Sequence, residues 1–256
     1  MRVTDKYTDP IEAAKQRAIQ EYEASNKNTP TTNTPGEVIK LPSEGRFYPE
    51  SSPLRKGYVD MKYMTAREED ILTNPSYIQE GIVIQKLLES MIITPGVDSD
   101  DILTCDFDAL VIGARCLGYG SKYKVTFAGK IYEINLNELT HNTWDIPTDA
   151  NGYFDFKTET NTYKLKLITN EMSNNINKDQ LITGFLKQCI VSINGNPEPE
   201  FIGHFIDNEM RRTESVQIQQ FIIDNLPKVD LEIEIEGDDG NITKSRFRIG
   251  SDFFRD

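Results

Sequence analysis

Strict alternation of charged and apolar side chains near the C-terminus is the feature that most constrains this chain. Residues 229–236 read VDLEIEIE, residues 242–249 read ITKSRFRI, and GDDGN separates them. If GDDGN is a loop, three acids face three bases and apolar residues face each other. The pairs are Glu234 with Lys244, Glu232 with Arg246, Asp230 with Arg248, Leu231 with Phe247, and Val229 with Ile249. The sequence therefore predicts an antiparallel hairpin with one charged and one apolar face.

Two further segments predict hairpins. In YKVTFAGKIYEINL, a two-residue turn at Ala128-Gly129 sets Lys124 opposite Glu133 and Val125 opposite Tyr132. In YFDFKTETNTYKLKLI, we place the turn at Thr160-Asn161. That turn gives the pairs Phe156 with Leu165, Asp155 with Lys166, and Phe154 with Leu167. Alternation over residues 58–63 predicts one more strand, with Val59, Met61 and Tyr63 on one side.

Helical signals separate these strands. Thr65 and Glu68 have the spacing of a capping box that opens a helix over 66–72, and Asn74-Pro75 ends it. Apolar residues at helical spacing predict further helices over 75–91, from Asp106 to the glycines Gly118 and Gly120, and over 178–193, 199–210 and 214–226. The predicted class is therefore α+β, with helical segments and several β-hairpins.

The first 37 residues differ in character from the rest. Asp9-Pro10 is a helix start, and one side of the predicted helix carries Ile11, Ala14, Ala18 and Tyr22. Residues 26–36, NKNTPTTNTPG, predict a flexible linker. The helix is either a frayed tail or a tethered segment that docks on a partner. Deleting residues 1–36 is expected to leave a folded domain and to weaken partner binding.

We therefore expect three regions in the chain. Residues 1–37 form the helix and linker, residues 38–140 form one α+β half, and residues 141–256 form a second half packed with the first as one unit.

Charge and composition argue against several classes of protein. Acidic residues number 41 and basic residues 28, giving a formal net charge of -13 that repels phosphate backbones. We expect neither a nucleic-acid partner nor a membrane one, because no run of ~20 apolar residues occurs. The N-terminus lacks the apolar core of a signal peptide. Cys105, Cys116 and Cys189 form no close pair, which indicates reduced, buried thiols in a cytoplasmic protein.

No motif points to catalysis, to a cofactor or to a metal. His141 and His204 have no histidine or cysteine at ligand spacing. Gly118 and Gly120 lack the third glycine of a dinucleotide fingerprint, so we interpret them as a helix C-cap. Residues 98–101, DSDD, lack the glycine and glutamate of a calcium loop, and we interpret them as a helix start. A hydrolase that uses two carboxylates stays the alternative from another class.

Three strings in the sequence resemble the baseplate-hub family of T4-type contractile-tailed bacteriophages. They are LPSEGRFYPE at 41–50, MTAREEDILTNPSYIQEGIVIQKLLESMI at 64–92, and DALVIGARCLGYGSKY at 108–123. The closing pattern from Pro227 through the hairpin to Phe253-Phe254 is also similar, so the resemblance spans most of 38–256. Many members of that family carry Cys-x-x-Cys pairs in their hairpins, which implies structural zinc. The turns here carry no cysteine, so we expect no metal.

The resemblance implies a protein of tail morphogenesis without enzymatic activity, partnered by other baseplate-hub or tail proteins. It would act in the cytoplasm of the infected bacterium as an assembly factor or chaperone of the hub. Alternatively, it would stay in the virion baseplate as a structural subunit. Our candidate partner-binding residues are Ile11, Ala14, Ala18, Tyr22, Phe47, Tyr48, Phe253 and Phe254. For the last four, burial in the core is the competing interpretation.

Overall fold

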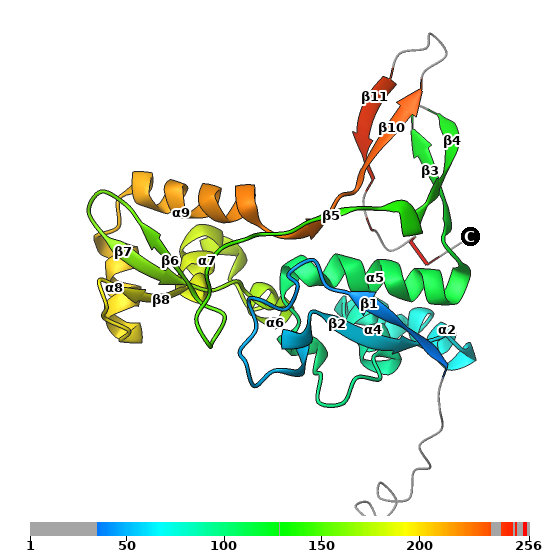
Figure 1. The fold of residues 1–256 in the computed structure, drawn as a ribbon, viewed down its shortest axis with the longest axis horizontal. Coiled ribbons are helices and arrows are strands. Elements are labelled where there is room, and N and C mark those ends of the chain that lie inside the picture. The colour runs from blue at the N-terminus through cyan, green and yellow to red at the C-terminus, as the bar shows by residue number, and fades with distance from the viewer. Residues whose placement is uncertain (1–34, 128, 237–241, 248, 250–252, 255–256) are drawn as a thin grey trace, which may run out of the picture. The chain divides into compact units, whose positions relative to one another are not determined.

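The computed structural model describes residues 35–127, 129–236, 242–247, 249 and 253–254. Residues 36–256 form one compact unit. Its class is α+β, as predicted, with helices and several small antiparallel sheets (Figure 1). The expected N-terminal helix, nearly all of the linker and the loop 237–241 lie outside the described residues.

The first sheet pairs strands β1 (Gly36–Lys40) and β2 (Tyr58–Lys62), with the short 3-10 helix η1 (Pro53–Lys56) between them. Val59 and Met61 are buried, as the alternation predicts. The prediction is wrong for Tyr63, which is 42% exposed. The strand has already ended there, because the next residues cap a helix.

The predicted helix at 66–72 is confirmed as α2 (Ala66–Leu72). The single helix predicted over 75–91 is wrong, since the structure has α3 (Pro75–Glu80) and α4 (Val83–Met91). Gly81 separates them with a left-handed φ of 74° and donates its amide to the end of α3. Helix α5 (Thr104–Tyr119) follows the 3-10 helix η2 (Ser99–Asp101), and Gly120 caps it at φ 85°.

Two hairpins have the predicted register. Strands β3 (Lys122–Phe127) and β4 (Lys130–Asn135) pair Lys124 with Glu133, and β10 (Glu232–Glu236) and β11 (Ile242–Arg246) pair Glu232 with Arg246. The predicted pairing of Val229 with Ile249 is wrong. Val229 instead belongs to β9 (Lys228–Val229), which pairs with β5 (His141–Asn142) after η3 (Leu136–Glu138). Arg248 lies outside the described residues.

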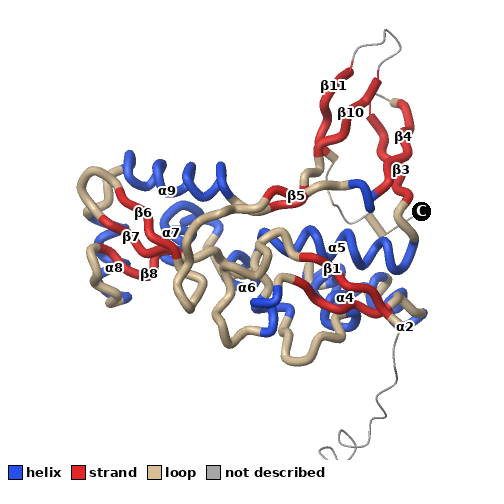
Figure 2. The backbone as a smooth tube through the Cα atoms, viewed as in Figure 1, coloured by secondary structure: helices blue, strands red, loops and turns tan. Residues whose placement is uncertain are grey.

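A three-stranded sheet joins β6 (Phe154–Lys157), β7 (Thr162–Leu165) and β8 (Ile190–Ile193), as Figure 2 shows. Its first hairpin differs from our register by two residues, because Phe154, not Phe156, pairs with Leu165. The predicted helix 178–193 is also too long. Its residues form the 3-10 helix η4 (Lys178–Gln180), then α7 (Leu181–Cys189), and then strand β8.

Helices complete this part of the fold. They are α6 (Asn170–Asn174), α8 (Pro199–Asn208) and α9 (Arg212–Asn225). The last two confirm the helices predicted at 199–210 and 214–226. A single cluster of buried apolar residues runs through 36–256, and its aromatic part brings the ring of Trp144 within 5.3 Å of Phe47 and 4.8 Å of Phe154.

Candidate functional site

A buried polar network fixes the loop 41–50 to the first turn of α5. The Asp106 carboxylate accepts from the Ser43 amide at 2.8 Å, the Ser43 hydroxyl at 2.6 Å and the Tyr48 hydroxyl at 2.8 Å. Tyr48 Oη in turn accepts from the Leu103 amide at 3.0 Å. The Asp106 carboxylate, which is 0% exposed, therefore joins two segments about 60 residues apart in the sequence.

The protonation chemistry of this network follows from its burial. Loss of hydration raises the pKa of Asp106, and the donors Ser43 and Tyr48 offset part of that rise. Burial, and then the neighbouring Asp106 charge, raise the pKa of Tyr48 and of Cys105 well above their usual values. Solvent does not reach the Asp106 carboxylate, and the Cys105 thiol stays protonated. These properties are typical of a structural contact that holds two segments together, rather than of a catalytic pair.

The turn within this loop requires glycine at position 45. Gly45 has φ +76°, and a Cβ there would lie 2.3 Å from the Arg55 carbonyl oxygen. The side chain of Arg55 also stabilises the loop, since its guanidinium donates hydrogen bonds to the carbonyls of Arg46 and Tyr48. The loop therefore has no room for a side chain at this turn.

Replacing Gly45 with alanine is expected to lower the free energy of unfolding by about 3 kcal/mol, because a steric clash adds to the cost of the left-handed backbone. Gly81→Ala is the matched control. Gly81 has φ +74°, but nothing lies within 4 Å of its added Cβ, so only the backbone cost of about 1 kcal/mol is expected. Urea unfolding followed by circular dichroism measures both. Equal losses in the two variants would contradict the role given to the Arg55 carbonyl.

The sequence-predicted residues Phe47 and Tyr48 are buried. They are 4% and 3% exposed, and Phe47 packs edge-on against Phe154 at 5.8 Å. The structure thus corrects their assignment as partner-binding residues, because neither presents a surface to another protein. The competing interpretation, burial in the core, is the correct one.

The C-terminal pair Phe253-Phe254 is buried as well, at 0% and 6% exposed. Both rings close on aromatic residues at the end of α5 and the start of β3, with Phe253 at 4.9 Å from Tyr123. The buried Arg115 guanidinium lies 4.9 Å from the Tyr123 centroid and 5.6 Å from that of Phe253. This pair is therefore also part of the core, and its assignment as partner-binding is corrected.

The other four predicted partner-binding residues, Ile11, Ala14, Ala18 and Tyr22, lie outside the described residues. Their role stays a prediction. None of the four candidates that the structure describes lies at a surface.

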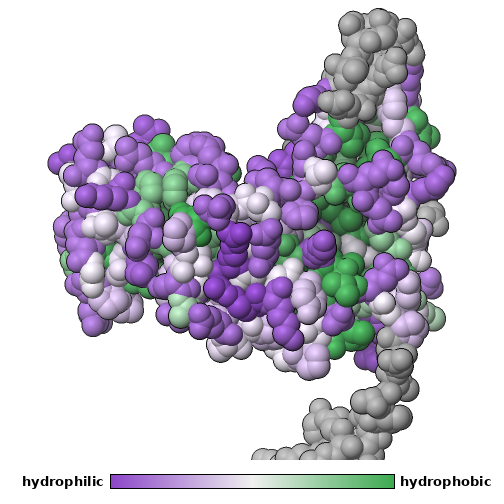
Figure 3. Space-filling view, in the orientation of Figure 1, coloured by the Kyte–Doolittle hydropathy of each residue, from purple (hydrophilic) through white to green (hydrophobic). Residues whose placement is uncertain are grey.

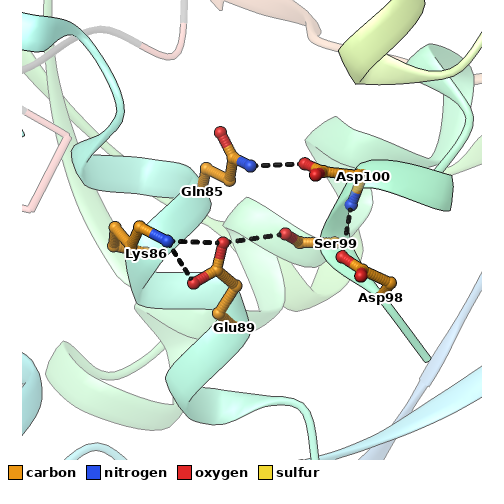
Figure 4. Close-up of polar contacts among 6 residues, drawn as sticks. All are labelled: Gln85, Lys86, Glu89, Asp98, Ser99 and Asp100. Atoms are coloured by element: carbon orange, nitrogen blue, oxygen red, sulfur yellow. Dashed lines mark hydrogen bonds and ion pairs between the residues drawn. The ribbon is translucent and has the colours of Figure 1, made fainter. Parts of the chain in front are cut away.

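The acidic run 98–101 caps a short helix and is tied to α4 (Figure 4). Asp98 accepts from the Asp100 amide at 3.1 Å, and Gln85 donates to the Asp100 side chain. Ser99 donates to Glu89, which is ion-paired with Lys86 at 2.7 Å. These contacts confirm the helix start. Within the described ranges, no group of three or more histidine, cysteine, aspartate or glutamate side chains is placed to hold a metal ion.

The histidines and cysteines are not joined into a site. His204 is a surface residue that lies 3.2 Å from Glu209, and His141 is exposed on β5. Cys105 and Cys189 are buried and Cys116 is half-buried, and all three are free thiols. Burial raises the pKa of Cys189 to about 12, so this thiol stays protonated at neutral pH.

Two other buried carboxylates organise loops. Glu68 accepts from Lys62 at 2.7 Å, Ser90 at 2.5 Å, and both the amide and hydroxyl of Thr65 at 2.8 and 2.6 Å. Glu214 accepts from Thr158, Thr160, Asn161 and Tyr163 at 2.7–3.2 Å. These donors lower the pKa of both acids although burial opposes them, and Glu68 reaches about 2.

Apolar surface, rather than polar chemistry, is the feature with functional potential. Figure 3 shows apolar side chains gathered over β1 and α5 and at the base of the hairpins. A groove of about 240 Å³ lies there, and its lining is mixed: Val38 and Ile112 are apolar, while Glu37, Lys40 and His141 are polar or charged. Val38 is 58% exposed, and β1 has β2 as its only strand neighbour in the described part of the chain.

A second groove, of about 390 Å³ and with a mainly apolar lining, lies between α6, α7 and α9. Leu181 at its edge is 62% exposed and Ile223 is 59% exposed. Sequence analysis missed both grooves, because an apolar residue that lines a surface groove has the same spacing along a helix as one in the core. No signal in the sequence separates the two.

No family model, no curated protein and no solved structure matches this chain. Among the residues with described positions, no helix combines the length and the apolar character that crossing a membrane requires.

Proposed function

We propose that this chain is a non-enzymatic protein of contractile phage tail morphogenesis, which assembles or chaperones the central hub of the baseplate. The alternative is a permanent structural subunit of that hub. Both assign it other hub or tail proteins as partners, and both assign it no cofactor and no metal. The first places it in the cytoplasm of the infected bacterium, and the second also in the virion baseplate.

One observation carries the proposal: the strings that resemble the baseplate-hub family contact each other. Asp106 holds the string 41–50 on α5. Helix α5 continues into the string 108–123, where a Cβ on Gly118 would lie 2.7 Å from Met64 Sδ at the start of 64–92. A resemblance whose residues together build one packed unit is more specific than scattered matches, which supports kinship at the level of the fold.

The apolar groove between α6, α7 and α9, with exposed Leu181 and Ile223 at its rim, supports a role in binding proteins. Contiguous apolar surface on a monomer is typical of protein interaction sites. The buried carboxylates Asp106, Glu68 and Glu214 all accept hydrogen bonds that hold loops and strands. Their use is accounted for by the fold, which favours an interaction protein over the hydrolase alternative.

Mass spectrometry of purified mature particles, set against lysate of the infected host, tests this function. A released assembly factor is expected to be abundant in the lysate and missing from the particle. A hub subunit is expected at a small, fixed copy number in the particle. A chain that is produced in infected cells but that neither enters the particle nor co-purifies with any tail intermediate would contradict both forms of the proposal.

Removing residues 1–35 is expected to leave the melting temperature of the remainder within a few degrees of the full chain. Residues 36–256 form a compact unit of their own with a continuous core. Binding of the truncated chain to a tail intermediate is expected to weaken, if the stripe of Ile11, Ala14, Ala18 and Tyr22 docks on the partner. Calorimetry and co-sedimentation measure the two effects separately. A truncated chain that unfolds would show that the segment belongs to the core.

A further inference from the structure

The groove between α6, α7 and α9 has an apolar lining with one charge. Its walls carry Leu181 and Phe185, four residues apart on α7, and Ile222 of α9 with Leu226, the residue that follows the end of α9. These helices can be followed in Figure 1. Lys166 is the only charged residue among the described residues that line the groove.

Lys166 is one of several lysines that no described acid pairs with, and it is the one that lines this groove. Its side chain is half-buried, and it forms no ion pair and no side-chain hydrogen bond within the described ranges. By contrast, Lys62, Lys86, Lys122, Lys164 and Lys187 each lie within 3.2 Å of a carboxylate oxygen. Although the chain has 41 acidic residues, none in its described part pairs with the lysine of this groove. The electrostatic complement of this groove is a carboxylate on the occupant.

The surroundings of the groove favour a helix as the occupant. Strand β7, which leads into Lys166, is paired on both sides, with β6 and β8, so β7 itself offers no free edge for strand addition. The walls are helices that present apolar rows at a spacing of four residues, into which a third helix can pack. Leu181 and Ile223 are each more than half exposed at the rim, and a helix seated there would cover them.

We propose that this groove binds an amphipathic helix of a partner protein, with apolar side chains between α7 and α9 and an acidic side chain paired with Lys166. The inference deepens the proposed function, on which it rests only for the source of the helix, a tail or hub protein.

The test is a selection from a displayed library of helical 16-residue peptides, made on the full chain. The double variant Leu181→Glu/Ile223→Glu serves for counter-selection, and Ile131→Glu is the matched control, since Ile131 is 69% exposed on β4 away from the groove. Circular dichroism and melting curves establish that all variants fold. Fluorescence anisotropy then measures affinity for the selected peptides.

The selected peptides are expected to share an apolar stripe bordered by glutamate or aspartate. Lys166→Glu is expected to weaken their binding about tenfold, and a peptide with lysine at the acidic position is expected to recover it. Ile131→Glu should leave the affinity unchanged. No enrichment over the counter-selected variant would overturn the proposal, as would peptides without an acidic preference that ignore Lys166→Glu. A dimer in sedimentation velocity that Ile223→Glu dissociates would assign the groove to a second copy instead, and would also overturn it.

The library peptides are not taken from phage tail or hub proteins. A failed selection therefore leaves the proposed function standing, and a particle that lacks the chain leaves the groove assignment standing.

Discussion

Replacing Asp106 with alanine is expected to lower the free energy of unfolding by about 4 kcal/mol. The substitution removes the acceptor for the Ser43 amide, the Ser43 hydroxyl and the Tyr48 hydroxyl, all buried, and each buried donor without a partner costs about 1–3 kcal/mol. Loop 41–50 then loses its attachment to α5, so Phe47 and its contact with Trp144 should loosen as well. Urea unfolding by circular dichroism and Trp144 fluorescence measures both effects.

Asp101→Ala is the matched control for this change. Asp101 lies five residues earlier, is exposed, and accepts no described side-chain hydrogen bond, so a change within about 0.5 kcal/mol is expected. If Asp106→Ala also stays within that range, the network does not hold the loop.

Glu68→Gln is expected to cost about 3 kcal/mol at neutral pH. The folded protein lowers the pKa of Glu68 from 4.5 to about 2 through Lys62, Ser90 and Thr65, and its carboxylate is 0% exposed. A shift of this size corresponds to about 3 kcal/mol of preference for the charged form. Glutamine keeps the shape but leaves the Lys62 charge unpaired. The neighbouring Glu69, which is exposed, gives the control Glu69→Gln, for which little change is expected.

The pH dependence of Glu68 has a definite sign. Because its folded pKa is lowered, its contribution is fully present above pH 4.5 and is lost as the pH falls toward 2. The stability difference between the wild type and Glu68→Gln should therefore shrink between pH 5 and pH 2. A difference that stays constant over that range would contradict the charged contact with Lys62.

The contribution of Asp106 to stability changes with pH in the opposite direction. Burial raises its pKa in the folded protein, so its contribution is fully present below the unfolded pKa of 3.8 and is lost as the pH rises through the folded value. Relative to Asp106→Asn, the wild type should lose stability as the pH rises above about 4. The fold thus stabilises the charged form of Glu68, whereas burial destabilises the charged form of Asp106.

Local signals were enough to predict the elements that local interactions make. The Thr65–Glu68 capping box, the stop at Asn74-Pro75 and the hairpin at residues 128–129 depend on residues within a few positions of each other. The hairpin β10–β11 was predicted in register because charge and hydropathy both select the same pairing. The segments 41–50, 64–92 and 108–123, which resemble the baseplate-hub family, can also be recognised in the sequence. Their role in the proposed function stays a prediction.

The errors fall where a distant residue decides the outcome. The β6–β7 loop spans residues 158–161 rather than turning at 160–161, because Glu214, more than 50 positions away, accepts from Thr158, Thr160 and Asn161. The helix predicted over 178–193 ends at Cys189 because Ile190–Ile193 pair with β7. Pairing with β5 likewise takes Val229 out of the last hairpin.

The candidate sites divide in the same way. Phe47, Tyr48, Phe253 and Phe254 were recognisable as clustered aromatic residues, but only their neighbours in space show that they are buried. Lys166, Leu181 and Ile223 carry no signal in the sequence, yet the tertiary structure places them around one groove. The sequence by itself determined the α+β class and the short-range turns and caps, since these interactions lie within a few residues. Burial, strand partners and surface grooves depend on contacts between distant segments, and only the tertiary structure decided them.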